Sequence, residues 1–171
     1  MKFTRSKINQ VIGFICLLTF SILGSYGFKA PNAQVSHKCL IQLSNYTGEG
    51  AYVVVSLLDT KGKYVKTLQV FGKDKKWWDD IPSWFKHLTT SKEKVDGVTG
   101  ASITAGDRKV FTLNTEDTYF NKGYKLRFES AVENQDYKEK DVEIEYSDEN
   151  VGKNINGSGY IRYIKLLKAN A

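Results

Sequence analysis

Tyr52-Val-Val-Val-Ser-Leu-Leu58 is the stretch that decides the fold, because β-branched and apolar residues fill it almost throughout. Such a composition is typical of a strand that is central in a sheet or buried on both faces. Tyr64–Phe71 follows after the turn signal Asp59-Thr-Lys-Gly62, so the two stretches predict a hairpin. Leu40–Ser44 precedes them, is also rich in strand-forming residues, and ends before the turn signal Thr47-Gly-Glu-Gly50.

A period of two returns further along the chain. Leu126–Val132 and Val142–Tyr146 alternate apolar with polar residues, which predicts half-buried strands. Lys109–Asn114 and Gly159–Leu167 supply two more candidate strands. About seven short strands at this spacing predict an all-β fold, an immunoglobulin-like antiparallel β-sandwich, with an open barrel as the alternative.

One segment interrupts the strand pattern. A proline close to two N-cap candidates, Asp80 and Ser83, predicts a short helix between Trp78 and Leu88. The loop Thr89–Gly106 that follows is longer than a sandwich turn requires, and long loops are often functional.

The N-terminal residues indicate export. Lys2, Arg5 and Lys7 precede an uncharged run from Ile8 to Phe28, the pattern of a signal peptide. We therefore expect residues 1–27 to be a signal peptide, 28–38 a flexible leader and 39–171 the sandwich domain. An uncleaved N-terminal membrane anchor is the alternative, and both interpretations place the domain in the periplasm or outside the cell.

Charge and cysteine content exclude several classes of function. The formal charge of +6 falls to +3 without the three basic residues of 1–27, and no dense basic patch predicts nucleic-acid binding. Cys39 would then be the sole cysteine, which excludes an internal disulfide and a Cys-x-x-Cys-His haem site. The two histidines, His37 and His87, lie fifty positions apart, so no metal-ligand spacing emerges. About 144 mature residues suffice for one domain that buries roughly two-thirds of its unfolded surface.

The long loop contains Asp96-Gly-Val-Thr-Gly-Ala-Ser102, which resembles the flavin-attachment motif of exported bacterial flavoproteins. The resemblance implies that Ser102 forms a phosphoester with FMN. It also implies a recognition shell of Asp96, Gly97, Thr99, Gly100 and Ala101. The family's acceptor is usually Thr, so Ser102 keeps the hydroxyl and lacks the methyl group, and Thr104 is the neighbouring alternative acceptor.

The residue types also make chemical sense apart from the resemblance. A hydroxyl can attack phosphorus, and a flexible Gly-Ala loop would let a second enzyme close around it. Asp96 could help to hold the metal that neutralises a pyrophosphate, or it could cap the turn. The transferase must be a separate protein, because this chain has no nucleotide site of its own. An unmodified turn-forming loop is the alternative reading of the same motif.

A broader resemblance covers most of the mature chain. Tyr52-Val-Val-Val, Lys63-Tyr-Val-Lys-Thr-Leu68, Gly72 with Lys-Lys-Trp-Trp, Trp84-Phe85 and Ile161-Arg-Tyr-Ile-Lys occur in this order around the Asp96 motif. The order is similar to that of a family of predicted periplasmic proteins defined as a domain of unknown function. This resemblance implies an electron-transfer role, with a flavin transferase and a membrane-bound redox protein as partners.

Several side chains near the motif have two interpretations. Trp77, Trp78, Trp84 and Phe85 could wall a flavin ring or form a core cluster at one end of the sandwich. His87 could relay protons or simply be solvated or cap the helix, while Lys92 and Lys94 are candidates for tuning a flavin potential. No catalytic residue beyond the cofactor is predicted. The alternative function is a non-enzymatic sandwich module that binds a protein or polysaccharide through exposed Trp and Tyr side chains.

Overall fold

The computed structural model describes residues 33–169. The chain divides into two units, residues 1–31 and 32–171, and only the second is described below. The expected signal peptide and the first part of the leader lie outside the described residues. No helix in residues 33–169 is long and apolar enough to cross a membrane.

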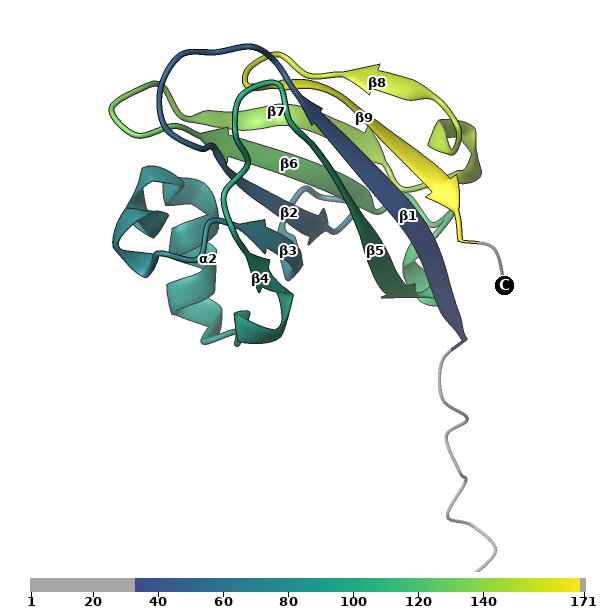
Figure 1. Cartoon of the computed structure of the whole chain (residues 1–171). Helices are drawn as coiled ribbons and strands as arrows, with labels where there is room; N and C mark the ends of the chain where they lie inside the picture. Colours follow the sequence, from purple (N-terminus) through teal and green to yellow (C-terminus); the bar gives the residue numbers. More distant parts are fainter. Residues whose placement is uncertain (1–32, 170–171) are drawn as a thin grey trace, which may run out of the picture. The chain divides into compact units, whose positions relative to one another are not determined.

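Two sheets form the domain (Figure 1). The first has the order β5-β1-β9-β8, with bounds Arg108–Glu116, Gln34–Leu43, Ile161–Lys168 and Asn154–Asn156. The second has the order β4-β3-β2-β6-β7, with bounds Thr99–Gly100, Tyr64–Phe71, Tyr52–Leu58, Lys125–Ala131 and Lys138–Glu145. The expected mostly β, sandwich-like fold with one short helix is confirmed.

Strand β2 is central in the second sheet, as its apolar composition predicts, and pairs antiparallel with β3 and β6. The short edge strand β4 is different, because it runs parallel to β3, with Thr99 opposite Val70 and Gly100 opposite Phe71. The second sheet is therefore mixed, and its parallel edge lies in the stretch that was expected to be a loop.

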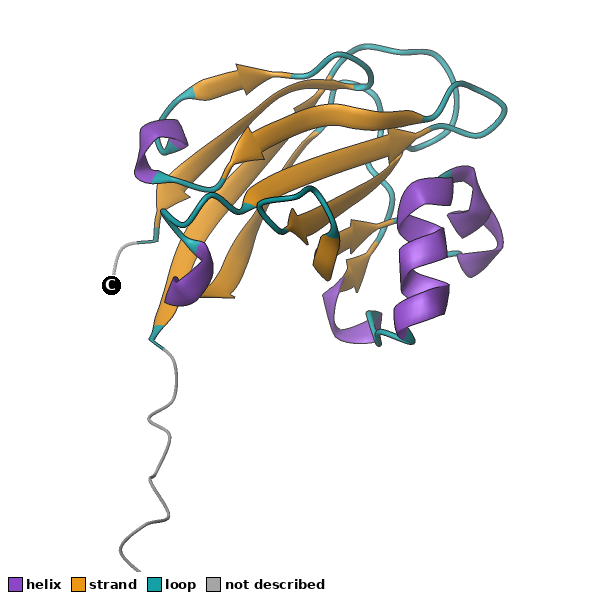
Figure 2. Ribbon diagram, turned by 180° about the vertical axis from the view of Figure 1, so that it is seen from behind, coloured by secondary structure: helices purple, strands orange, loops and turns teal. Residues whose placement is uncertain are grey.

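The side-chain alternation of the second sheet creates two faces. Leu126 and Phe128 of β6 point into the main core between the sheets. The opposite face of this sheet packs against α2 (Pro82–Ser91), with Val54 and Val70 in contact with Trp84 and its neighbours. Figure 2 shows α2 and the helical turns next to it beside this sheet, whereas other short helical turns lie at the far side of the domain. Strand β6 therefore lies between the main core on one face and the α2 layer on the other. Its polar residues Arg127 and Glu129 are buried as well.

Two boundaries differ from expectation. Strand β1 begins at Gln34, so residues 34–38 are not a flexible leader but pair with β5, and in part with β9. His37, expected in that leader, is buried and contacts the Tyr146 hydroxyl through Nδ1 at 3.0 Å. Helix α2 begins at Pro82 after a separate 3₁₀ turn, η1 (Lys75–Asp80), and its N-cap position is Ile81, not Asp80 or Ser83.

Candidate functional site

The motif that begins at Asp96 is an ordered edge of the second sheet. It starts with a 3₁₀ turn, η2 (Asp96–Val98), that follows the buried residue Val95. The Thr99 hydroxyl donates to the Val95 carbonyl at 2.7 Å, which closes this turn. Gly100 then accepts a hydrogen bond from the Gly72 backbone N–H at 2.8 Å, so β4 is attached to the end of β3.

Ser102 lies between two fixed points of the backbone. Gly100 is held by β3 on one side, and Ile103 exchanges two backbone hydrogen bonds with Ala51, of 2.8 and 2.9 Å, on the other. The expectation of a flexible protruding loop is therefore wrong, because backbone pairing on both sides orders the segment. Ala101 is exposed and Ser102 is half-buried at the surface of this edge.

The Ser102 side chain opens onto a small hollow of about 140 Å³. Aromatic side chains of Tyr52 and Trp77 and three carboxylates, Glu49, Asp80 and Glu133, also line it. Gly50 forms the wall next to the hydroxyl, since a Cβ atom on Gly50 would lie 2.7 Å from Ser102 Oγ. The hollow is smaller than the roughly 300–1,000 Å³ of pockets that enclose drug-sized ligands.

The fold does not require the side-chain type found at several positions of the motif. Asp96 does not cap η2; its carboxylate accepts from Lys75 Nζ at 3.0 Å, and both side chains are largely exposed. Gly100 has no positive φ, and a Cβ atom there would come no closer than 3.9 Å to another atom. Gly97 is exposed, with nothing within 4 Å of such a Cβ atom. In contrast, Thr99 closes the turn, so the fold accounts for that residue.

The aromatic residues before the motif divide between core and hollow. Trp78 and Trp84 are buried, and their indole N–H groups donate to the Gly72 carbonyl and to Thr67 Oγ1. Phe85 packs against the same cluster, so Trp77 alone of these four lines the Ser102 hollow. Among residues 33–169 the large hydrophobic side chains that are exposed are Val65, Val110 and Leu167. Trp77 and Tyr52 are half-buried, and a binding module that uses Trp and Tyr side chains stays a prediction.

The remaining sequence candidates do not join the Ser102 hollow. Thr104 is exposed and does not line it, although its carbonyl accepts from the Asp107 N–H in a turn. Lys92 and Lys94 are exposed elsewhere, and Lys92 ends α2 in a left-handed conformation. His87 lines a different hollow, to which α2, β3, β6 and β7 contribute.

That second hollow adjoins a buried polar cluster between α2 and the sheet. Glu129 is fully buried on β6 and accepts hydrogen bonds from the hydroxyls of Tyr64, at 2.6 Å, and Tyr137. Burial raises the pKa of Glu129 to about 7, although the two hydrogen bonds and Arg127 oppose the shift. Burial also raises the pKa of Tyr64, and the hydrogen bond to Glu129 adds to this effect.

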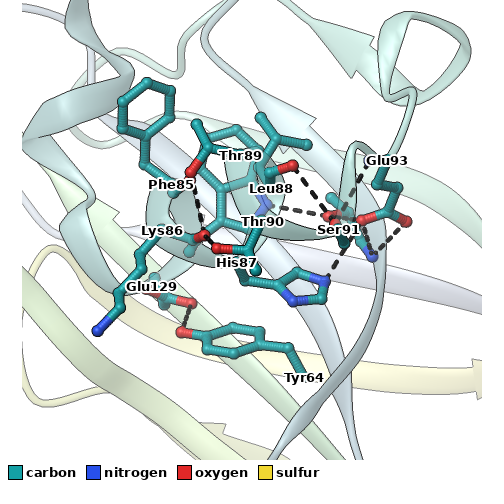
Figure 3. Close-up of polar contacts among 12 residues, drawn as sticks. Tyr64, Phe85, Lys86, His87, Leu88, Thr89, Thr90, Ser91, Glu93 and Glu129 are labelled. Carbon is teal, nitrogen blue, oxygen red and sulfur yellow. Dashed lines mark hydrogen bonds and ion pairs between the residues drawn. The ribbon is translucent and has the colours of Figure 1, made fainter.

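His87 extends the cluster along α2. Its ring stacks on Tyr64 with centroids 5.1 Å apart, as Figure 3 shows. Nε2 of His87 lies 3.7 Å from Glu93 Oε2, too far for a hydrogen bond, and is buried without a hydrogen-bond partner. Glu93 itself accepts from the backbone N–H and the hydroxyl of Thr67. The cluster thus fixes α2 against β3 and β6.

Sequence reasoning missed this cluster because alternation along β6 assigns Arg127 and Glu129 to solvent. A usable signal was present in the helix, since Trp84 and Leu88 are spaced four residues apart and require an apolar face to cover. A helix that covers a sheet buries the polar residues of that face as well. No group of three or more His, Cys, Asp or Glu residues in 33–169 could hold a metal ion.

The fold and the site define a class: a mostly β sandwich whose larger sheet carries one helix and whose parallel edge presents a half-buried serine hydroxyl. The chain belongs to the family described as Predicted periplasmic protein (DUF2271), whose model matches residues 34–163. That description places the family in the periplasm, in agreement with the exported location expected from the N-terminal residues. No curated protein and no solved structure matched the chain.

Proposed function

We propose that this protein is an exported electron carrier that holds FMN through a phosphoester on Ser102. Its partners would be a flavin transferase and a membrane-bound redox protein. The cofactor, when bound, supplies the exchange of electrons, and the protein tethers it in a compartment from which a small soluble molecule would be lost. The expected signal peptide over residues 1–27 would deliver the chain to that compartment.

The observation that carries the proposal is that Asp96 and Gly100 are present without a structural reason. A glycine in a strand weakens the strand by roughly 0.5–1 kcal/mol relative to Ala. Gly100 nevertheless occupies β4 with negative φ and with room for a Cβ atom. Asp96 contributes only an exposed ion pair, which is worth little to stability. Recognition by a second protein explains both residues, since close approach to a backbone requires glycine.

The residues around Ser102 suit a cofactor that is attached to the protein but not enclosed by it. The hydroxyl reaches the surface, and Tyr52 and Trp77 offer apolar faces beside it. The hollow is too small to enclose a flavin ring, so the ring would stay accessible to a redox partner. Glu49, Asp80 and Glu133 surround the hydroxyl with negative charge, which disfavours a reduced, anionic flavin. We expect a lower potential than that of the free cofactor.

Attachment needs a single displacement at phosphorus. The Ser102 oxygen forms a bond to the FMN phosphorus of FAD, the pyrophosphate bond breaks, and AMP leaves. The hydroxyl proton passes to a base of the transferase. Asp96, exposed on its 3₁₀ turn and paired only with Lys75, is free to face the transferase and its metal.

Intact-mass analysis tests the proposal. Export of the protein together with a flavin transferase should give a yellow product about 440 mass units heavier than the bare chain. Ser102→Ala should remove the added mass, whereas Thr104→Ala should retain it, because Thr104 does not line the hollow. A bare wild-type chain from cells in which a known substrate is labelled would overturn the proposal.

A further inference from the structure

The hollow that His87 lines is a broad, open depression of the surface with a mostly polar and charged lining. Its volume is about 540 Å³, within the range of pockets that hold small molecules. Elements distant in sequence contribute to it: α2 provides Lys86 and His87, β3 provides Tyr64, β6 provides Arg127, and β7 provides Lys140.

The floor of this hollow is held rigidly. The guanidinium of Arg127 donates through Nε to Glu143 Oε2 at 2.8 Å and through Nη1 to Glu139 at 3.1 Å, and its Nη2 forms an ion pair with Glu143 Oε2 at 2.7 Å. The Tyr64 ring lies against His87, with its hydroxyl fixed on Glu129. Because these side chains are already ordered, a ligand would bind without the entropic cost of fixing them.

The rim carries unpaired positive charge. Lys86 and Lys140 are exposed, and neither forms an ion pair within residues 33–169. Glu139 is the one carboxylate in the lining, and its Oε1 accepts from Arg127 Nη1 at 3.1 Å. The two lysine ammonium groups, each with three donors, therefore give the lining more positive than negative charge.

From this arrangement we infer that the hollow binds a small molecule that carries a phosphate or a carboxylate group between Lys86 and Lys140. The lining favours a ligand with a polar body as well, since most of its side chains carry hydroxyl, imidazole or charged groups. The site lies apart from Ser102, which does not line it, and it does not depend on flavin attachment.

NMR titration of the purified protein tests the inference, with inorganic phosphate, citrate and glucose 6-phosphate as probes at constant ionic strength. At least one probe should give saturable shifts at the backbone amides of Gly62, His87 and Lys140, residues of this lining. Binding of phosphate compounds alone would assign the phosphate class, and binding of citrate alone the carboxylate class.

A double variant and its matched control complete the test. Lys86→Gln with Lys140→Gln should weaken binding of that probe at least ten-fold. Lys38→Gln with Lys122→Gln makes the same change in net charge at exposed positions outside the lining, and should leave affinity within two-fold. Absence of saturable shifts with all three probes, or equal losses in both double variants, would overturn the inference.

Discussion

Glu129 should make the stability of the domain depend on pH in an unusual direction. In the unfolded chain its carboxyl has an ordinary pKa of 4.5, whereas in the folded protein burial raises the pKa to about 7. Between these values the folded state holds a proton that the unfolded state has released. The contribution of Glu129 to folded stability is therefore greatest below pH 4.5, falls as the pH rises through this window, and becomes level above about 7.

The magnitude follows from the width of the window. Each pKa unit corresponds to 1.36 kcal/mol, so the free energy of unfolding should fall by about 2–3 kcal/mol between pH 5 and pH 8. Glu129→Gln resembles the protonated form and should lack this component. The difference in unfolding free energy between wild type and variant isolates Glu129, because other titrating groups contribute equally to both proteins.

Urea unfolding followed by tryptophan fluorescence measures this difference, since Trp78 and Trp84 are buried in the cluster beside Glu129. Glu145→Gln is the matched control, because Glu145 is exposed on the neighbouring strand β7. Its difference from wild type should not change across the window. A difference for Glu129→Gln that is equal at pH 5 and pH 8 would refute the reasoning.

Three further substitutions distinguish effects on folding stability from effects on the proposed flavin attachment. Gly100→Ala should change the unfolding free energy by no more than about 1 kcal/mol, yet lower flavin labelling at least ten-fold by intact mass. Gly97→Ala is the control, because Gly97 is exposed outside β4 with open space for a Cβ atom, and it should keep labelling. Gly50→Ala should slow labelling, because its Cβ atom would lie 2.7 Å from Ser102 Oγ, and normal labelling would contradict that geometry. Asp141→Ala should lower the unfolding free energy, measured by urea unfolding, by about 4–5 kcal/mol. The reason is that the buried Asp141 carboxylate accepts hydrogen bonds from three backbone N–H groups and one hydroxyl. A loss below about 1 kcal/mol would refute this.

The strands were predictable because each carries its own periodicity. Tyr52–Leu58 is apolar on both faces and is indeed central. Leu126 and Phe128 face the core in the predicted register, but the prediction that their strand is half-buried is wrong, because Arg127 and Glu129 on its other face are buried as well. β4 was not predictable, because a strand of two residues has no period and depends on pairing with β3. The first residues of β1 were missed for a related reason, since they are exposed at alternate positions and resemble a polar leader.

The candidate site, like the strands, could be predicted from the sequence only in part. Ser102 and its motif could be identified from the sequence because the residues of the motif are consecutive. Trp77 and Gly50, which line the Ser102 hollow, come from segments that only the fold brings together. The cluster around Glu129 depends even more on tertiary structure, since Tyr64, Tyr137 and His87 come from different elements and none of them signals a buried carboxylate by sequence alone.

The order of the proposed attachment segment has a consequence for the proposed transferase. The backbone is fixed at Gly100 by β3 and at Ile103 by Ala51, so only Ala101 and Ser102 lie between the two anchors. A transferase cannot draw this short span deep into its own active site without breaking those hydrogen bonds. It must instead approach the edge of the sheet, where β4 has no further strand beside it. Gly100 lies on that open edge and has no side chain to cover the backbone there. Approach of a second protein to this backbone therefore explains a glycine that the fold does not require.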